Sequence, residues 1–120
     1  MRQSTRTRRR TLFEEALDAI RHDFSDESLS LADVAHRIAT SRRQLQRVLS
    51  EQGTSFRAEL QRVRMARAAA LLRDPALPVA SVARAVGYRQ AAQFSKAFRR
   101  HYGQPPSALR RAAPVQRVAA

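Results

Sequence analysis

Cysteine and tryptophan are absent from this 120-residue sequence, and glycine occurs only three times. The lack of cysteine excludes disulfides, thiolate metal ligands and a cysteine nucleophile, and it is typical of proteins from reducing compartments. Runs of apolar residues are also too short for a membrane-spanning helix or for the core of a signal peptide. We therefore expect a cytoplasmic protein that has no membrane partner.

Acidic residues are scarce relative to basic ones. Lysine and arginine together number 23, against 10 aspartates and glutamates, which gives a formal net charge of +13. All of the cations except Lys96 are arginines, so a compositional bias explains the preference for arginine but not the deficit of acids. A domain with this balance attracts polyanions, and nucleic acid is the most common of them.

The sequence features of catalysis are missing as well. The three histidines, His22, His36 and His101, lie far apart, and none has a partner at the spacing of metal ligands. The sequence contains no nucleophile elbow, Walker motif or glycine-rich loop. We therefore expect no enzymatic activity, no cofactor and no metal site.

The sequence does contain a succession of helical patterns. Apolar residues recur at three- and four-residue intervals, and this periodicity predicts an all-α fold of about seven helices. Capping residues and glycine or proline breaks divide the pattern. The predicted segments are a basic disordered arm at 1–10, a folded helical domain at 11–112 and a tail at 113–120. Within that domain we expect a helix at 12–24 capped by Thr11 and Glu14, a first helical pair at about 30–53, a linker helix at about 55–73, a second pair at about 79–102 and a short helix ending near 111.

Two parts of the sequence repeat one another. LADVAHRIATSRRQLQRVL begins at residue 31 and VASVARAVGYRQAAQFSKAF at residue 79, and their Val-Ala pairs, Val34-Ala35 and Val82-Ala83, are 48 residues apart. The alanine of each pair lets a second helix cross closely, and Ala39 and Gly87 are small where the chain must reverse. The repeat predicts two helix-turn-helix units joined by a long helix.

The second helix of each predicted unit has one face that the core does not need. Leu45 and Phe94 anchor these helices, and the free faces are rich in arginine and amides. In the major groove arginine reads guanine, glutamine reads adenine, and alanine contacts the thymine methyl group. The available side chains are Arg42, Arg43, Gln46, Arg47 and Ser50 in the first unit and Arg89, Gln90, Ala91, Gln93, Lys96, Arg99 and Arg100 in the second. A linker helix of about 28 Å would let a monomer contact two successive major-groove segments.

These motifs resemble the DNA-binding domain of the AraC/XylS family of transcriptional regulators over about residues 12–111. SVARAVGYRQAAQFSKAFRRHYGQPPSALRR is similar to the second helix-turn-helix of that family, and SLADVAHRIATSRRQLQRVL is similar to the first. The resemblance implies a sequence-specific regulator with seven helices, of which helices 3 and 6 enter the major groove of double-stranded DNA. It also implies base contacts from Arg43, Gln46 and Arg47 and from Ala91, Ala92, Gln93 and Lys96, with Gln90 and Ser95 nearer the phosphates.

The sequence departs from the family pattern at two places. Ala91 and Ala92 are short, so the second unit would read fewer bases and depend more on backbone contacts. Leu109 replaces an aromatic residue often found there, which is a conservative change at a core position.

Two alternatives stay open at this point. A non-specific architectural DNA-binding protein would share the basic helices but lack sequence preference. Most members of the family add an effector-binding or dimerisation domain, so the chain could also be the DNA-binding fragment of a larger effector-controlled regulator. An activator must in addition contact RNA polymerase, and the acidic candidates for that contact are Glu14, Glu15, Asp18, Glu51 and Glu59.

Overall fold

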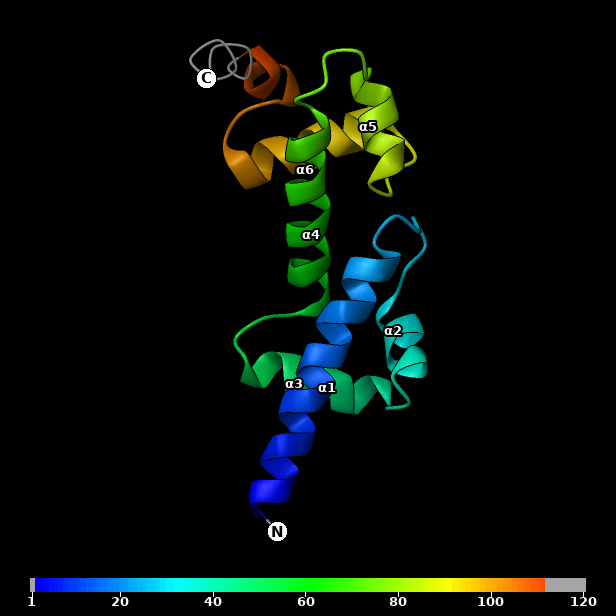
Figure 1. The fold of residues 1–120 in the computed structure, drawn as a ribbon, viewed down its shortest axis with the longest axis vertical. Helices are drawn as coiled ribbons and strands as arrows, with labels where there is room; N and C mark the ends of the chain where they lie inside the picture. Colours follow the sequence, from blue (N-terminus) through cyan, green and yellow to red (C-terminus); the bar gives the residue numbers. More distant parts are fainter. Residues whose placement is uncertain (1, 112–120) are drawn as a thin grey trace. The chain divides into compact units, whose positions relative to one another are not determined.

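The computed structural model describes residues 2–111, and this part of the chain is helical with short connections (Figure 1). The helices are α1 (Arg2–Asp23), α2 (Leu31–Arg37), α3 (Arg42–Glu51), α4 (Phe56–Leu71), α5 (Val79–Ala85) and α6 (Ala91–Tyr102), followed by a short helix at residues 106–111. The prediction of an all-α fold with about seven helices is confirmed. Within these residues, no helix combines the length and the apolar character needed to cross a bilayer.

The chain divides into two compact units. Of the described residues, the first contains 2–24 and 28–63, and the second contains 25–27 and 64–111. Helix α4 therefore contributes its first half to one unit and its second half to the other. Each unit holds one of the two predicted helical pairs, α2–α3 in the first and α5–α6 in the second.

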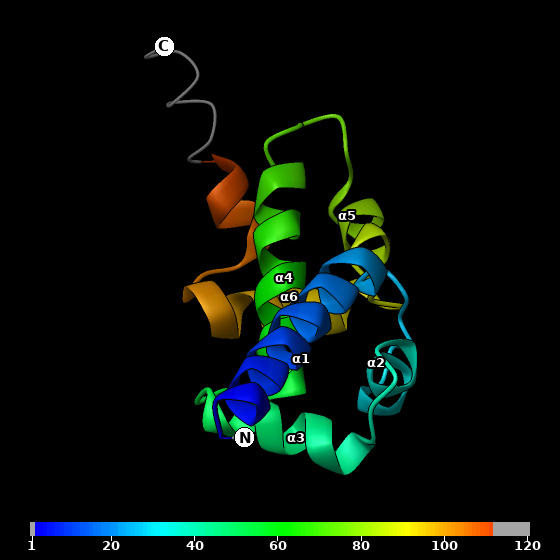
Figure 2. The ribbon, with the colours of Figure 1, turned by 60° about the horizontal axis from the view of Figure 1, so that its bottom comes forward.

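In the first unit, α1 packs against both α2 and α3, and α2 packs against α3 (Figures 1 and 2). The core contains Ile20 of α1, Val34 and Ala35 of α2, and Leu45 and Leu49 of α3, none of which is more than 2% exposed. Burying a leucine or isoleucine side chain contributes about 1.5–3 kcal/mol. Ala35 lies among these larger residues, as expected where two helices cross closely.

Side-chain caps begin both helices of the first pair. The Ser30 hydroxyl accepts from the backbone N–H of Asp33, and the Asp33 carboxylate accepts in return from the Ser30 N–H, which forms a complete capping box before α2. The turn then passes through Ala39, which has a left-handed backbone with φ of 57°. The Ser41 hydroxyl accepts from the Gln44 N–H at 3.0 Å and so begins α3.

In the second unit, α5 packs against α6, and the core is largely aromatic. Phe94 and Phe98 of α6 are fully buried, and their ring centroids lie 5.7 Å apart. The Tyr88 ring meets Phe94 edge-on, also at 5.7 Å between centroids. Such pairs contribute about 0.5–1.5 kcal/mol beyond the area that they bury. Ala83, 1% exposed, is buried at the position that corresponds to Ala35.

The helices of the second pair begin without side-chain caps. Pro78 and Gln90 occupy the N-cap positions of α5 and α6, and neither makes a side-chain capping hydrogen bond. Gly87 supplies the left-handed residue of the turn with φ of 94°. Gly103 ends α6, also in a left-handed conformation with φ of 79°. Its N–H donates to the Arg99 carbonyl.

The buried arginine Arg64 connects residues 25–27 to the rest of the second unit. Its guanidinium donates to the Asp26 carbonyl at 2.9 Å and lies 5.5 Å from the centre of the Tyr88 ring. Burial lowers the pKa of Arg64 from its ordinary value, whereas Tyr88 and Asp26 act in the opposite direction. In the same segment, Glu27 accepts from Arg89 at 2.6 Å. The second unit therefore includes a short stretch of chain that precedes α2.

The prediction of a disordered arm at 1–10 is wrong, because α1 already begins at Arg2. Thr11 does not cap a helix with Glu14; its hydroxyl donates to the Thr7 carbonyl one turn earlier. Arginine and glutamine are good helix formers, so the pattern of α1 continues towards the N-terminus. The linker helix, at Phe56–Leu71, is slightly shorter than the 55–73 expected. The predicted tail at 113–120 lies outside the described residues.

Candidate nucleic-acid interface

Helix α3 separates its apolar side chains from its polar ones. Leu45, Val48 and Leu49 are at most 2% exposed and fix the helix against the first unit. An α-helix has 3.6 residues per turn, so their three- and four-residue spacing places them on one side and leaves the opposite side in solvent. The four predicted contact residues on this helix are all exposed, namely Arg42, Arg43, Gln46 and Arg47.

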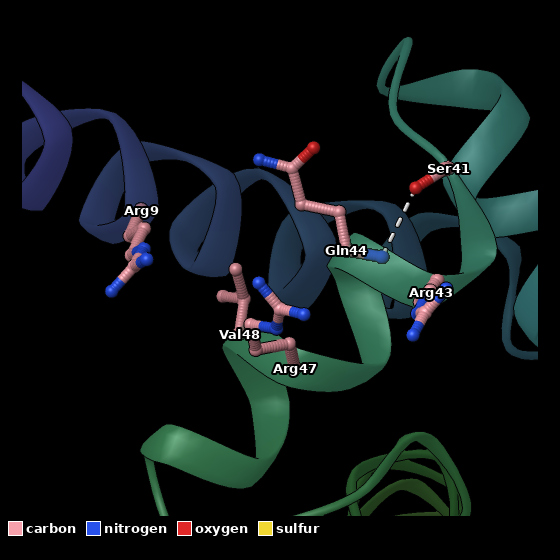
Figure 3. Close-up of a pocket in the computed structure, with 6 residues that line it drawn as sticks. All are labelled: Arg9, Ser41, Arg43, Gln44, Arg47 and Val48. Atoms are coloured by element: carbon pink, nitrogen blue, oxygen red, sulfur yellow. Dashed lines mark hydrogen bonds between the residues drawn. The ribbon is translucent and has the colours of Figure 1, made fainter.

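A hollow of about 390 Å³ lies between α1 and one side of α3 (Figure 3). Arg43 and Arg47 line it from α3, one helical turn apart, and Arg9 lines it from α1. Ser41, Gln44 and Val48 complete the lining. The structure therefore brings two of the predicted contact residues together with an arginine that sequence reasoning did not single out.

The remaining contact residues of α3 lie elsewhere on its exposed surface. Gln46 lines a second hollow, of about 260 Å³, together with Leu31, Phe56 and Arg57. Arg42 lines neither of the two hollows described here. The exposed face of α3 is thus divided between an arginine-lined side and a side where an amide lies next to apolar residues.

Helix α6 repeats the arrangement with different residues. Phe94 and Phe98 are fully buried, whereas Gln90, Gln93, Lys96 and Arg100 are exposed. Ala92, a further predicted contact, is also exposed, whereas Ala91 and Ser95 are half-buried. These two short side chains reach less far into solvent than the exposed side chains of Gln93 and Lys96.

One arginine near α3 and one near α6 each form an ion pair with a carboxylate. Arg9 donates to Glu51 at 3.2 Å in the first unit, and Arg89 donates to Glu27 at 2.6 Å in the second. Sequence reasoning noted Arg89 but missed Arg9, which was one of five arginines in the first ten residues. The partners are 42 and 62 residues apart in sequence, so no local pattern indicated either pair.

Potential metal ligands do not gather in the described part of the chain. There, no group of three or more histidine, cysteine, aspartate or glutamate side chains is placed to hold a metal ion. The exposed faces of α3 and α6 offer positive charge and hydrogen bonds from arginine, lysine and glutamine side chains.

The chain matches the family model described as a helix-turn-helix domain over residues 34–112. It is 43% identical over 86 residues to an uncharacterized HTH-type transcriptional regulator of Mycobacterium bovis, a match that covers 70% of this chain and 25% of that protein. The chain spans about a quarter to a third of the length of the first curated relatives that it matches.

Solved structures of transcriptional regulators and of their DNA-binding domains have a similar fold. A transcriptional regulator of Chromobacterium violaceum, described by its AraC-type DNA-binding domain, has a TM-score of 0.80 and 27% identity, covering 87% of this chain and 93% of that one. The DNA-binding domain of AdpA, solved with a target DNA, has a TM-score of 0.78 and 26% identity, covering 90% of this chain and 97% of that one. The fold seen here is therefore one that a known protein uses on DNA.

Proposed function

This chain belongs to the AraC-type family of helix-turn-helix transcriptional regulators, and we propose that it reads one duplex by placing α3 and α6 in successive segments of the major groove. The observation that carries the proposal is the repetition of one arrangement. In each unit a buried anchor, Leu45 or Phe94, holds a helix whose opposite face presents exposed cations and amides. Such faces match the donor and acceptor pattern of base edges.

The proposed contacts differ between the two helices. On α3, Arg43, Gln46 and Arg47 would contact bases, with Arg42 beside them. On α6, Gln93 and Lys96 would contact bases together with the short side chain of Ala91, whereas Gln90, Ser95 and Arg100 would lie nearer the phosphates. Because long side chains reach base edges more readily, we expect most of the sequence preference to come from α3.

Selection of bound duplexes from a random pool tests the proposal directly. We expect one enriched sequence whose two conserved segments are about one helical turn apart. Because binding should neutralise about 6–10 phosphates, raising the salt concentration from 50 to 200 mM should lower the affinity by a factor of roughly 10³–10⁵. Strong binding with no enriched sequence would instead support a non-specific architectural protein.

A single substitution connects the enriched sequence to α3. Gln46→Ala should relax the preference at particular base pairs by about 1–3 kcal/mol while leaving other positions unchanged. The matched control is Gln52→Ala, because Gln52 is exposed at the C-cap of the same helix. Equal weakening on every duplex would make Gln46 a phosphate contact.

The proposal extends to partners and location. We expect the chain to bind its duplex as a monomer, because each unit carries its own recognition helix; sedimentation of the complex measures this. RNA polymerase is the proposed second partner, with exposed acids such as Glu14 and Glu15 as its contact points. The proposed role is binding rather than catalysis, and the proposed location is the cytoplasm.

A further inference from the structure

The hollow beside α3 has an excess of positive charge. Three arginines line it, Arg9, Arg43 and Arg47, and no acidic residue belongs to its described lining (Figure 3). Like charges gathered in one hollow repel one another, and an anion placed there removes this repulsion. The hollow therefore fits a small, multiply hydrogen-bonding anion better than it fits an apolar group.

One carboxylate acts at the edge of this cluster. Glu51, at the C-terminal end of α3, accepts from Nη1 of Arg9 at 3.2 Å. Both side chains are 42% exposed, so water and salt screen the pair. Exposed ion pairs of this kind contribute little to stability. Glu51 thus orients Arg9 without holding it firmly.

We propose that Arg9 is a phosphate-binding residue, whose guanidinium exchanges Glu51 for a DNA backbone phosphate when α3 enters the groove. The inference rests on the proposed function, because it is α3 that brings the duplex to the hollow. It adds to that function a contact from α1, outside both helical pairs.

The exchange is favoured by the chemistry of the two acceptors. A guanidinium has five N–H donors, and phosphate oxygens accept two of them side by side, whereas Glu51 accepts from a single nitrogen of Arg9. Each phosphate neutralised by a cation also releases condensed counterions. Glu51 itself opposes DNA, since its charge has the same sign as the phosphates. Removing the two partners should therefore change affinity in opposite directions.

The experiment measures the affinity of the full chain for its selected duplex and for an unrelated duplex, as a function of salt. Arg9→Ala should weaken both by the same factor, about tenfold, and should lower the magnitude of the salt slope by about one. The matched control is Arg8→Ala, because Arg8 is exposed on the same helix and does not line the hollow. Its effect should be several times smaller.

A double-mutant cycle separates exchange from a general effect of charge. Glu51→Gln should tighten binding about threefold, and this gain should disappear when Arg9 is already alanine. Glu15→Gln removes the same charge from α1, where Glu15 is exposed, and its effect should not depend on Arg9. Thermal unfolding of each variant checks that Arg9→Ala leaves the helices intact.

The outcomes distinguish this inference from the proposed function. If wild-type protein prefers the selected duplex but Arg9→Ala binds as tightly as wild type, or loses no more than Arg8→Ala, the role of Arg9 is overturned while the proposed function stands. The role of Arg9 is also overturned if Glu51→Gln gains equally with and without Arg9. If wild-type protein shows no preference between duplexes, the proposed function fails, and the Arg9 cycle on generic DNA still tests the phosphate contact.

Discussion

The two helical pairs make the same turn by different means. Both begin alike: the N–H of Thr40 donates to the Ala35 carbonyl at 2.9 Å, and the N–H of Tyr88 donates to the Ala83 carbonyl at the same distance. They then diverge, because two residues separate the C-cap of α2 from the N-cap of α3, whereas three separate the C-cap of α5 from the N-cap of α6. In the second turn, Tyr88, at the position that corresponds to Thr40, packs edge-on against the Phe94 ring.

This difference shows that local and tertiary interactions can replace one another. The first pair depends on serine caps at Ser30 and Ser41 and accepts an alanine in a left-handed conformation at Ala39. The second pair has no side-chain caps but has a glycine at the strained position and an aromatic cluster around α6. Each pair therefore has a different weak point.

The largest expected effect tests the aromatic cluster. Phe94→Ala should cost about 3–5 kcal/mol, because a fully buried ring leaves a cavity between Tyr88 and Phe98. Hydrogen exchange measured residue by residue should show the loss in the second unit, with the first unit protected. Phe94→Leu, which keeps most of the volume, should cost much less. Equal loss of protection in both units would show that they unfold as one body.

Exchanging the turn residues tests the strained position. Gly87→Ala should destabilise the second unit by about 1 kcal/mol or more, because an alanine resists a positive φ. Ala39→Gly should have the opposite sign and a smaller size, about 0.5 kcal/mol, since relief of strain is offset by the greater freedom of glycine in the unfolded chain. Urea unfolding measures both. Two changes of the same sign would contradict the equivalence of these positions.

Exchanging caps is expected to have a similar or slightly smaller effect. Ser41→Ala should cost about 1 kcal/mol, because it removes the acceptor for the Gln44 N–H. Gln90→Ser should stabilise α6 by up to about 1 kcal/mol by adding a cap that is lacking now. Ser50→Ala, at an exposed site inside α3, serves as the control in the same thermal unfolding series.

The smallest expected effect depends on pH and is confined to the first unit. Hydrogen bonds from His22 and Arg37 hold the pKa of Asp23 below its ordinary value of 3.8, although burial acts to raise it. Stability from Asp23 is therefore present above pH 3.8 and is lost as the pH falls through the lowered pKa. Asp23→Asn should cost about 0.5 kcal/mol or less at pH 7 and nothing in strong acid. The residue 48 positions after Arg37 is Ala85, so the second unit has no equivalent of the Arg37 cation that pairs with Asp23. A difference between the two proteins that persists at pH 2 would contradict this account.

Sequence periodicity predicted the elements whose burial is decided locally. The Val-Ala pairs, the small turn residues and the anchors Leu45 and Phe94 all occupy the positions expected, because a short amphipathic helix has only one way to bury its stripe. The exposed faces of α3 and α6 follow from the same reasoning. Which bases or phosphates those faces contact stays a prediction.

Helix α4 shows where this reasoning stops. Its apolar residues do not form one continuous buried stripe: Ala66 and Ala70 are exposed, whereas Met65 and Ala68, and Leu72 just after the helix, are buried. The first half of the helix packs in one unit and the second half in the other, so its buried face need not follow one line. Arg9 and Arg64 were missed for a related reason, since their partners come from distant parts of the chain.

The placement of Ser25–Glu27 in the second unit has a practical consequence for dissecting the protein. A fragment that starts at Arg64 would lack Asp26, whose carbonyl accepts from the buried guanidinium, and Glu27, which pairs with Arg89. The two halves are therefore interleaved along the polypeptide, and no single cleavage point yields both of them whole. A circular permutant would have to keep the three-residue segment joined to the C-terminal half.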